Sequence, residues 1–376
     1  MPSSTPSPSV AAPARRLLGL DQARALAILA MMVAHFAPGL FKQLPGLSSI
    51  ETPVLWFGRT ATPAFVVVFG VTVGIVFLPR FLKGDVERTR QRLWRRTGLI
   101  VLCAVLISVP HFVRMAVHRP GPGEPPPTVW DWVFGTYTVL FFYAIGLALL
   151  PAWLAWLKTW TAPKAVAAGG VLWAATVLGC RAWPGESTLT GTEFVRMVLI
   201  SGPFAYLPMM GTTLVAIPVG LGLYRASKAG TDGRFLWLML AGGVALAALG
   251  AGLGFAAGEY DLDRIVSGDL KAPSRPWYFL HFGGMAVAAI AGLELLTRGV
   301  RAFRPVGYVL ALFGQTSLVL FTAHMFVLPV LELADHVGRM SGLVRVAVAF
   351  VPFAVFCALV MYGQHRYLQR RAAGGE

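Results

Sequence analysis

The chain has 376 residues, of which 56% are hydrophobic and 13% are charged, and its mean hydropathy is +0.66. Soluble domains carry about 25% charged residues, so this composition excludes an ordinary soluble protein and indicates a polytopic membrane protein. The net charge of +15 would suit a nucleic-acid-binding protein. We exclude nucleic acid as a partner, because the basic residues lie between long apolar runs rather than on a polar domain.

The order of apolar runs predicts a short tail followed by one membrane domain. Residues 1–16 are rich in Pro, Ser and Ala and predict a disordered cytoplasmic tail. Residues 17–371 predict an all-α bundle of about ten transmembrane helices, since each run is close to the roughly twenty residues that a helix needs to cross a bilayer. The expected spans are 17–37, 62–81, 97–117, 133–156, 164–182, 204–224, 235–257, 277–297, 307–331 and 343–362.

The distribution of Lys and Arg predicts the orientation. With the N-terminus inside, the cytoplasmic segments hold twenty of the 32 Lys and Arg residues and the outer segments hold eleven. Both termini are therefore predicted to be cytoplasmic. The most basic segment, PRFLKGDVERTRQRLWRRTG, lies between the second and third spans. It either anchors the topology or binds anionic phosphates through arginines such as Arg92, Arg95 and Arg96, and both interpretations stay open.

The first span carries Asp21, Arg24 and His35. Ionisable groups inside a spanning helix are costly and usually functional. Arg24 and His35 are eleven residues apart, which at about 100° per residue places both on one face, about 16 Å apart along the axis. Asp21 shares this face to within about 60°. One stripe therefore carries an acid and a cation near the inner surface and an imidazole toward the outer one.

Further polar residues cluster on the outer side of the predicted topology. Four of the seven histidines lie there: His35, His111, His281 and His324. His111 and His281 fit ordinary core or interface positions, whereas the deeper His35 and His324 are candidates for a general base. Arg59 marks either the interface or a binding site. The polar segment 258–275 either caps a site or is an ordinary solvated loop. The three cysteines show no metal-ligand or disulfide spacing.

Four short patches resemble the acyltransferase 3 family. They are LDQARALAILAMMVAH in the first span, FVVVFGVTVG in the second, RLWRR before the third and GQTSLVLFTAH in the ninth. The first patch has Leu-Asp followed by Arg24 and His35 with ten residues between them. The second departs from the family pattern, because Phe69 precedes Gly70 where the family usually has serine.

The resemblance implies a multi-pass acyltransferase of the plasma (inner) membrane. Its donor would be cytoplasmic acyl-CoA, acetyl-CoA first of all, and its acceptor a hydroxyl of an extracytoplasmic carbohydrate or lipid-linked glycan, with membrane lipids around it and no metal. We assign catalytic roles to His35, Arg24 and His324, and donor-binding roles to Asp21, Arg59, Arg92, Arg95, Arg96, Gln315 and Ser317. Direct transfer with His35 as general base and an acyl-histidine intermediate both stay open. The alternatives are a transporter or flippase for an anionic substrate and a non-catalytic scaffold.

Overall fold

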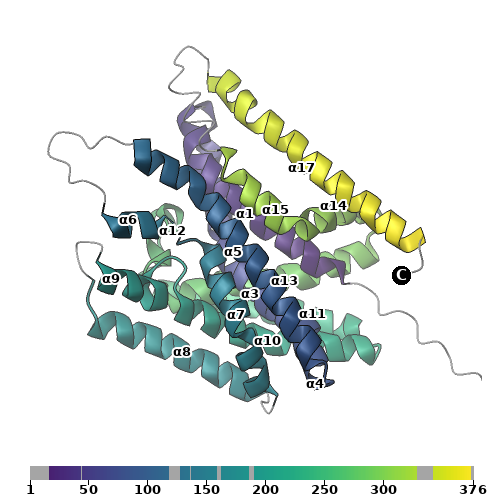
Figure 1. Ribbon diagram of the computed structural model, residues 1–376. Helices are drawn as coiled ribbons and strands as arrows, with labels where there is room; N and C mark the ends of the chain where they lie inside the picture. Colours follow the sequence, from purple (N-terminus) through teal and green to yellow (C-terminus); the bar gives the residue numbers. More distant parts are fainter. Residues whose placement is uncertain are drawn as a thin grey trace, which may run out of the picture.

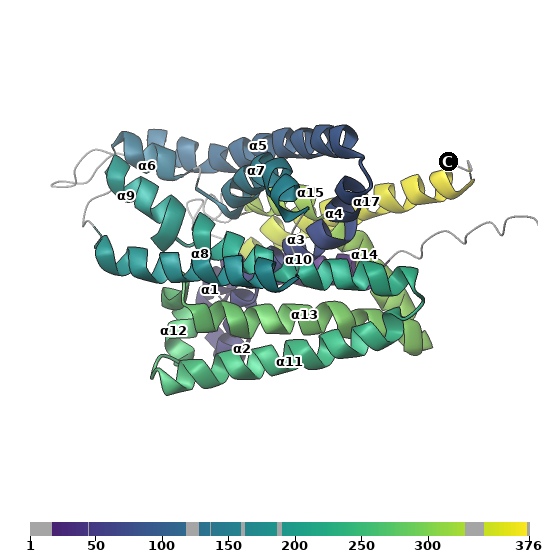
Figure 2. The same cartoon turned by 90° about the horizontal axis from the view of Figure 1, so that it is seen from below.

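Long helices that run side by side make up the described part of the protein (Figures 1 and 2). The computed structural model describes residues 17–43, 45–117, 128–135, 137–158, 162–185, 190–327 and 342–373. Within these ranges there is no strand. They contain nine segments long and apolar enough to cross a membrane, and one bent helix pair that would make a tenth. The predicted all-α bundle of about ten spans is confirmed, the inside location of the termini stays a prediction, and the tail 1–16 lies outside the described residues.

The helices follow one another in the order that hydropathy predicts. The first half contains α1 (Leu18–Gln43), η1 (Pro45–Ile50), α2 (Glu51–Arg59), α3 (Ala61–Thr72), η2 (Val73–Phe77), α4 (Leu78–Leu82), α5 (Val86–Val117), α6 (Val129–Phe134), α7 (Val139–Leu157) and α8 (Ala162–Ala182). The second half contains α9 (Gly191–Arg196), η3 (Met197–Ser201), α10 (Tyr206–Lys228), α11 (Asp232–Ala256), α12 (Leu262–Ser267), η4 (Asp269–Lys271), α13 (Pro276–Gly299), η5 (Arg301–Phe303), α14 (Arg304–Gln315), α15 (Ser317–His324) and α17 (Gly342–Ala373).

Several boundaries differ from the sequence prediction, among them the starts of the third and fourth spans. The basic segment is not a loop, because α5 begins at Val86 and carries its arginines directly into the third span. Residues 86–97 contain no Gly or Pro and are rich in good helix formers, so the helix continues beyond the apolar part. The fourth span begins at Val139 rather than near residue 133. A capping box at Thr128 and Asp131 starts the separate short helix α6 before it.

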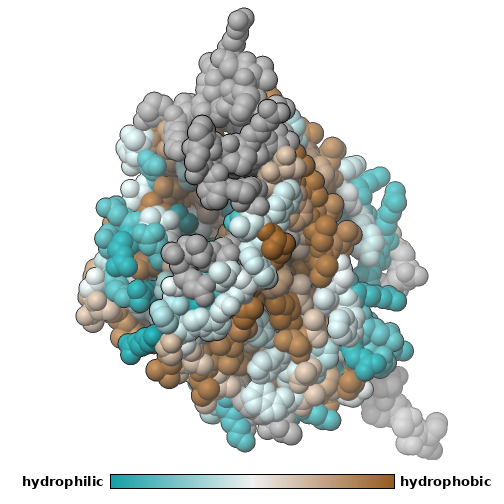
Figure 3. Space-filling view, turned by 60° about the vertical axis from the view of Figure 1, so that its left-hand side comes forward, coloured by the Kyte–Doolittle hydropathy of each residue, from teal (hydrophilic) through white to brown (hydrophobic). Residues whose placement is uncertain are grey.

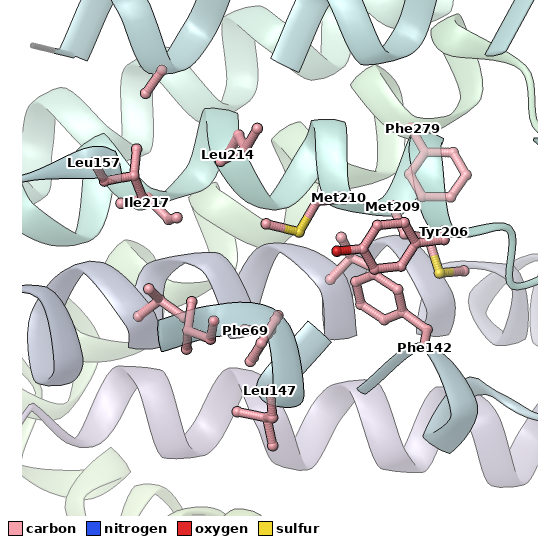
Figure 4. Close-up of a cluster of buried hydrophobic side chains, with 14 of the residues drawn as sticks. Phe69, Phe142, Leu147, Leu157, Tyr206, Met209, Met210, Leu214, Ile217 and Phe279 are labelled. Carbon is pink, nitrogen blue, oxygen red and sulfur yellow. The ribbon is translucent and has the colours of Figure 1, made fainter. Parts of the chain in front are cut away.

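The centre of the bundle is formed by α1 and α3. In the apolar stretch of the span Gly46–Leu82, 83% of the residues are buried. The corresponding share is 6% for the span within α17, which lies at the edge in Figure 1. Gly70 allows α3 to approach α10 closely, because a Cβ there would lie 2.5 Å from the Thr213 carbonyl oxygen. Figure 4 shows the resulting core, where Phe69 and Met210 pack with side chains of α7.

The surface has the pattern of a membrane protein. In Figure 3 a hydrophobic zone runs down the visible face between two hydrophilic margins. Large apolar side chains are exposed on the outer helices, for example Leu102 on α5, Leu249 on α11 and Leu359 on α17. Helices satisfy their backbone hydrogen bonds internally, so such apolar faces are suited to lipid.

The ninth span is broken. The axes of α14 and α15 differ by 69° at Thr316. Gly314 lies against α1, since a Cβ there would be 1.8 Å from the Asp21 carbonyl oxygen. Irregular backbone within a span is tolerated where it is buried in protein or lines a cavity. The break brings Gln315 and Ser317 to the face of α1 that carries Asp21 and Arg24.

Candidate active site

One cavity lies at the Arg24 end of the central helices. It has a volume of about 370 Å³ and is enclosed by α1, α3, α5, α7 and the broken α14–α15 span. Its charged and polar lining consists of Arg24, Thr72, Arg96, Gln315 and Ser317, and the rest of the wall is almost entirely apolar or aromatic. We call it the inner chamber. It suits a ligand with a long, flexible body and a few polar groups.

Arg24 is oriented by a chain of hydrogen bonds. Its Nη1 pairs with Asp21 Oδ1 at 3.0 Å and its Nη2 donates to Thr72 Oγ1 at 3.2 Å. Gln315 Nε2 donates to the second Asp21 oxygen at 3.3 Å, and Gln364 Nε2 donates to Gln315 Oε1 at 3.1 Å. Asp21 and Arg24, which the sequence places on one face of the first span, therefore form an ion pair. A guanidinium has five N–H donors, so Arg24 keeps donors for a ligand in the inner chamber.

The inner chamber is electropositive. Arg96 joins Arg24 in its lining and packs over the Phe77 ring, 5.4 Å from the centroid. No carboxylate is among the described residues that line it. The N-terminus of α15 opens onto it at Ser317, and helix N-termini attract anions. The chamber is therefore built to bind an anionic group.

The structure separates the three arginines that the sequence grouped together. Arg95 lines a different groove with Glu87 and Trp94, between α5 and α7. Arg92 is exposed and lines neither this groove nor the inner chamber. Adjacent positions differ by about 100° around a helix, so Arg95 and Arg96 cannot share one site.

A second cavity, of about 230 Å³, lies at the His35 end of the same helices. We call it the outer chamber. His35 on α1 is exposed and lines this chamber. The other polar residues in the lining are Arg59, Thr62, Tyr137, Thr138 and Lys271. None of the described residues forms a hydrogen bond with the His35 ring. Its ring is accessible from this chamber.

His324 lies directly behind His35. The two ring centroids are 5.3 Å apart, and His324 is fully buried and lines neither chamber. Its Nδ1 donates to the Phe321 carbonyl oxygen, whereas its Nε2 is buried with no partner among the described residues. His324 therefore contacts the His35 ring and does not reach either chamber.

The two chambers share a wall. Phe65, Val139 and Phe321 line both, and the rings of Phe65 and Phe321 meet edge to face with centroids 6.2 Å apart. The Tyr143 hydroxyl donates to the Phe65 carbonyl oxygen at 2.7 Å and so fixes this part of α3. Phe69, where the chain departs from the family pattern, lines the inner chamber beside Tyr143. The side chains common to the two chambers are all apolar.

The remaining sequence candidates lie outside both chambers. His111 contacts the Asp131 carbonyl oxygen at 3.3 Å and His281 contacts the Ala247 carbonyl oxygen at 2.8 Å, so both have the backbone partners expected of core residues. Over the described ranges, no group of three His, Cys, Asp or Glu side chains is arranged to hold a metal.

Sequence reasoning missed several residues that complete the site. Lys271 comes from the outer segment 258–275, and Tyr137 and Thr138 precede α7. The polar segment 258–275 did point to a role for Lys271, because one of the two interpretations of this segment was a cap over a site. The aromatic wall residues gave no signal, since Phe is favourable in any membrane span.

These features define a polytopic membrane protein with two polar cavities that share an apolar wall. A family model described as an acyltransferase domain matches residues 17–363, and the chain belongs to this acyltransferase 3 family. The protein is thus a membrane acyltransferase by family. The comparisons with curated proteins and with solved structures returned no match.

Proposed function

We propose that the protein transfers an acyl group from cytoplasmic acyl-CoA to a hydroxyl on the other side of the plasma (inner) membrane. The observation that carries this proposal is the common wall of the two chambers, with Arg24 and Arg96 in one and His35 in the other. The distance between Arg24 and His35, about 16 Å along α1, is close to the length of an extended pantetheine arm.

In this proposal the donor enters from the inner end. Its phosphates meet Arg96, Arg24 and the N-terminus of α15, because charge-assisted hydrogen bonds to phosphate are strong and directional. The pantetheine arm lies along the apolar wall of the inner chamber, and the thioester passes between Phe65 and Phe321. Acetyl is the acyl group that we expect, because the two rings are in contact and have to separate for the acyl group to pass.

The chemistry takes place at His35. The acceptor oxygen attacks the thioester carbonyl carbon while the neutral imidazole takes the hydroxyl proton. The carbon–sulfur bond then breaks, the acyl group remains on the acceptor oxygen as an ester, and the proton passes from the imidazolium to the CoA thiolate. His324 is a positioning residue in this scheme, because it touches the His35 ring and not the chambers.

We expect Arg96→Gln to weaken acyl-CoA binding by about tenfold to hundredfold, the value of a hydrogen bond to a charged group. Arg95→Gln is the matched control, because Arg95 lies one residue away and faces a different groove. Binding of labelled acyl-CoA at several salt concentrations is the measurement. Equal losses in the two variants would mean that the segment attracts CoA only as a diffuse basic surface.

We expect Phe321→Ala to raise the use of butyryl-CoA relative to acetyl-CoA by about tenfold or more, since removing a ring opens space for further methylenes. A buried Phe→Ala change also lowers the stability of the protein. The ratio of the rates with the two donors is measured in one preparation and does not depend on how much protein is folded. Phe326→Ala is the control, because Phe326 is exposed and lines neither chamber. An unchanged ratio would show that the ring does not limit the acyl group.

The experiment that tests the function uses purified protein and acetyl-CoA labelled in the acetyl group. With an acceptor glycan we expect CoA release and label on the acceptor. Label held on the protein in the absence of acceptor would identify an acyl-histidine route instead of direct transfer. A transporter would show neither CoA release nor label transfer.

A further inference from the structure

The outer chamber has an uneven distribution of charge. Arg59 from α2 and Lys271 from η4, which are far apart in the sequence, both line it. The described lining residues include no Asp or Glu. Burying cations without a partner is costly, so such an arrangement calls for an anion. The donor does not supply one, because its thioester end is neutral and its phosphates remain at the inner end in the proposed function.

Arg59 is held in place by the outer segment. Its Nε donates to the Val266 carbonyl oxygen at 2.9 Å, and its own carbonyl oxygen accepts from the Tyr278 hydroxyl at 2.7 Å. Gly268 packs on the guanidinium, since a Cβ there would lie 2.9 Å from Nη1. Asp269 is the carboxylate that acts on Arg59 through space, and it is exposed. The guanidinium is therefore fixed but not neutralised by an ion pair among the described residues.

Lys271 is held differently. Its Nζ lies 4.2 Å from the centre of the Phe204 ring, and it forms no ion pair with the described residues. It is half-buried, and it lines the outer chamber. Burial, with a smaller contribution from Arg59, lowers the pKa of the Lys271 amine to about 7. The cation–π contact stabilises the ammonium form only in part. A ligand anion would stabilise it further through an ion pair.

We propose that the acceptor is an anionic carbohydrate, whose carboxylate or phosphate binds between Lys271 and Arg59 while a neighbouring hydroxyl meets His35. This inference rests on the proposed function and names its acceptor class. The fixed guanidinium supplies direction and the flexible ammonium supplies charge. A neutral sugar would leave both cations without a counter-ion, so the chamber discriminates against it.

The pKa of Lys271 gives the proposal a pH signature. The titratable groups that line the chamber with the amine are Arg59 from α2, His35 from α1 and Tyr137. Asp269 and Tyr278 act on Arg59 through space. An anion stabilises the ammonium form and raises the pKa above 7. Anion binding should therefore be strongest near pH 6 and fall as the amine loses its proton above about pH 8.

The test measures binding to the full-length protein in lipid nanodiscs. The probes are methyl glucuronide, glucose 6-phosphate and neutral methyl glucoside, and the readout is the rise in Tm with probe concentration at pH 6 and pH 9. We expect at least one of the two anions to bind at pH 6 and the neutral glucoside to bind about tenfold to hundredfold more weakly. A response to methyl glucuronide alone or to glucose 6-phosphate alone identifies the anion as carboxylate or phosphate.

Two variants separate charge from structure. Lys271→Gln should remove the preference for the anions, whereas Lys271→Arg should keep it and retain it at pH 9, where the parent has lost it. Arg181→Gln is the control, because Arg181 is an exposed cation at the end of α8, away from both chambers.

Three outcomes overturn the inference: no binding of either anion, equal binding of neutral and anionic sugars, or an unchanged preference in Lys271→Gln. Binding of labelled acetyl-CoA and release of CoA are measured on the same preparation. Failure of those donor reactions in the parent counts against the proposed function. Intact donor reactions without an anion preference count against this inference alone.

Discussion

Replacing His35 by alanine is expected to reduce acyl transfer by about 10²–10⁴-fold, the usual contribution of a general base. The affinity for acyl-CoA should stay close to that of the parent, because His35 lines the outer chamber and the donor's phosphates bind in the inner one. The measurement pairs the transfer rate with the equilibrium binding of labelled acyl-CoA.

Two further histidine variants sharpen this result. His365→Ala is the control, since His365 is bonded to Tyr308 on α14 and lines neither chamber. His324→Ala should give a smaller loss than His35→Ala and a shifted pH–rate profile, because His324 acts on the His35 ring and not on the substrate. If His35→Ala turns over at the parent rate, the shared face of α1 is structural and the mechanism is wrong.

Replacing Arg24 by glutamine is expected to weaken acyl-CoA binding by about tenfold to hundredfold, because the inner chamber loses one of its two cations. It should also destabilise the protein. Asp21 is buried and pairs with Arg24 at 3.0 Å, and removing one partner of a buried pair costs about 3–5 kcal/mol. Donor binding and Tm are both measured.

A double variant separates these two effects. Asp21→Asn combined with Arg24→Gln removes both charges, so it should recover much of the stability while donor binding stays weak. Recovery of donor binding together with stability would show that Arg24 acts only through the fold. In that case Arg96 and the α15 N-terminus would be the donor's anion site by themselves.

The fold was predictable from the sequence because it depends on local patterns. Hydropathy places a helix wherever about twenty apolar residues occur together, and each helix satisfies its own backbone. The main errors are at boundaries, where Val86 and Thr128 obey helix propensity and capping rather than hydropathy. The alignment of Arg24 with His35 was also predictable, since it follows from the period of a single helix.

The site needed contacts between residues far apart in the chain. Lys271 reaches the His35 chamber from a segment more than two hundred residues away, and Phe65 meets Phe321 across a similar distance. Such contacts depend on how helices pack, which a one-dimensional pattern does not encode.

The sequence by itself determined an all-α membrane bundle, the stripe of Asp21, Arg24 and His35, and a resemblance to a family of acyltransferases. The tertiary structure alone decided that Arg96 and not Arg95 faces the inner chamber, that His324 supports His35 from behind, and that the two chambers share one aromatic wall. The physical reason is that helix period and hydropathy are set by neighbours in sequence, whereas a cavity is the space that several packed helices leave between them.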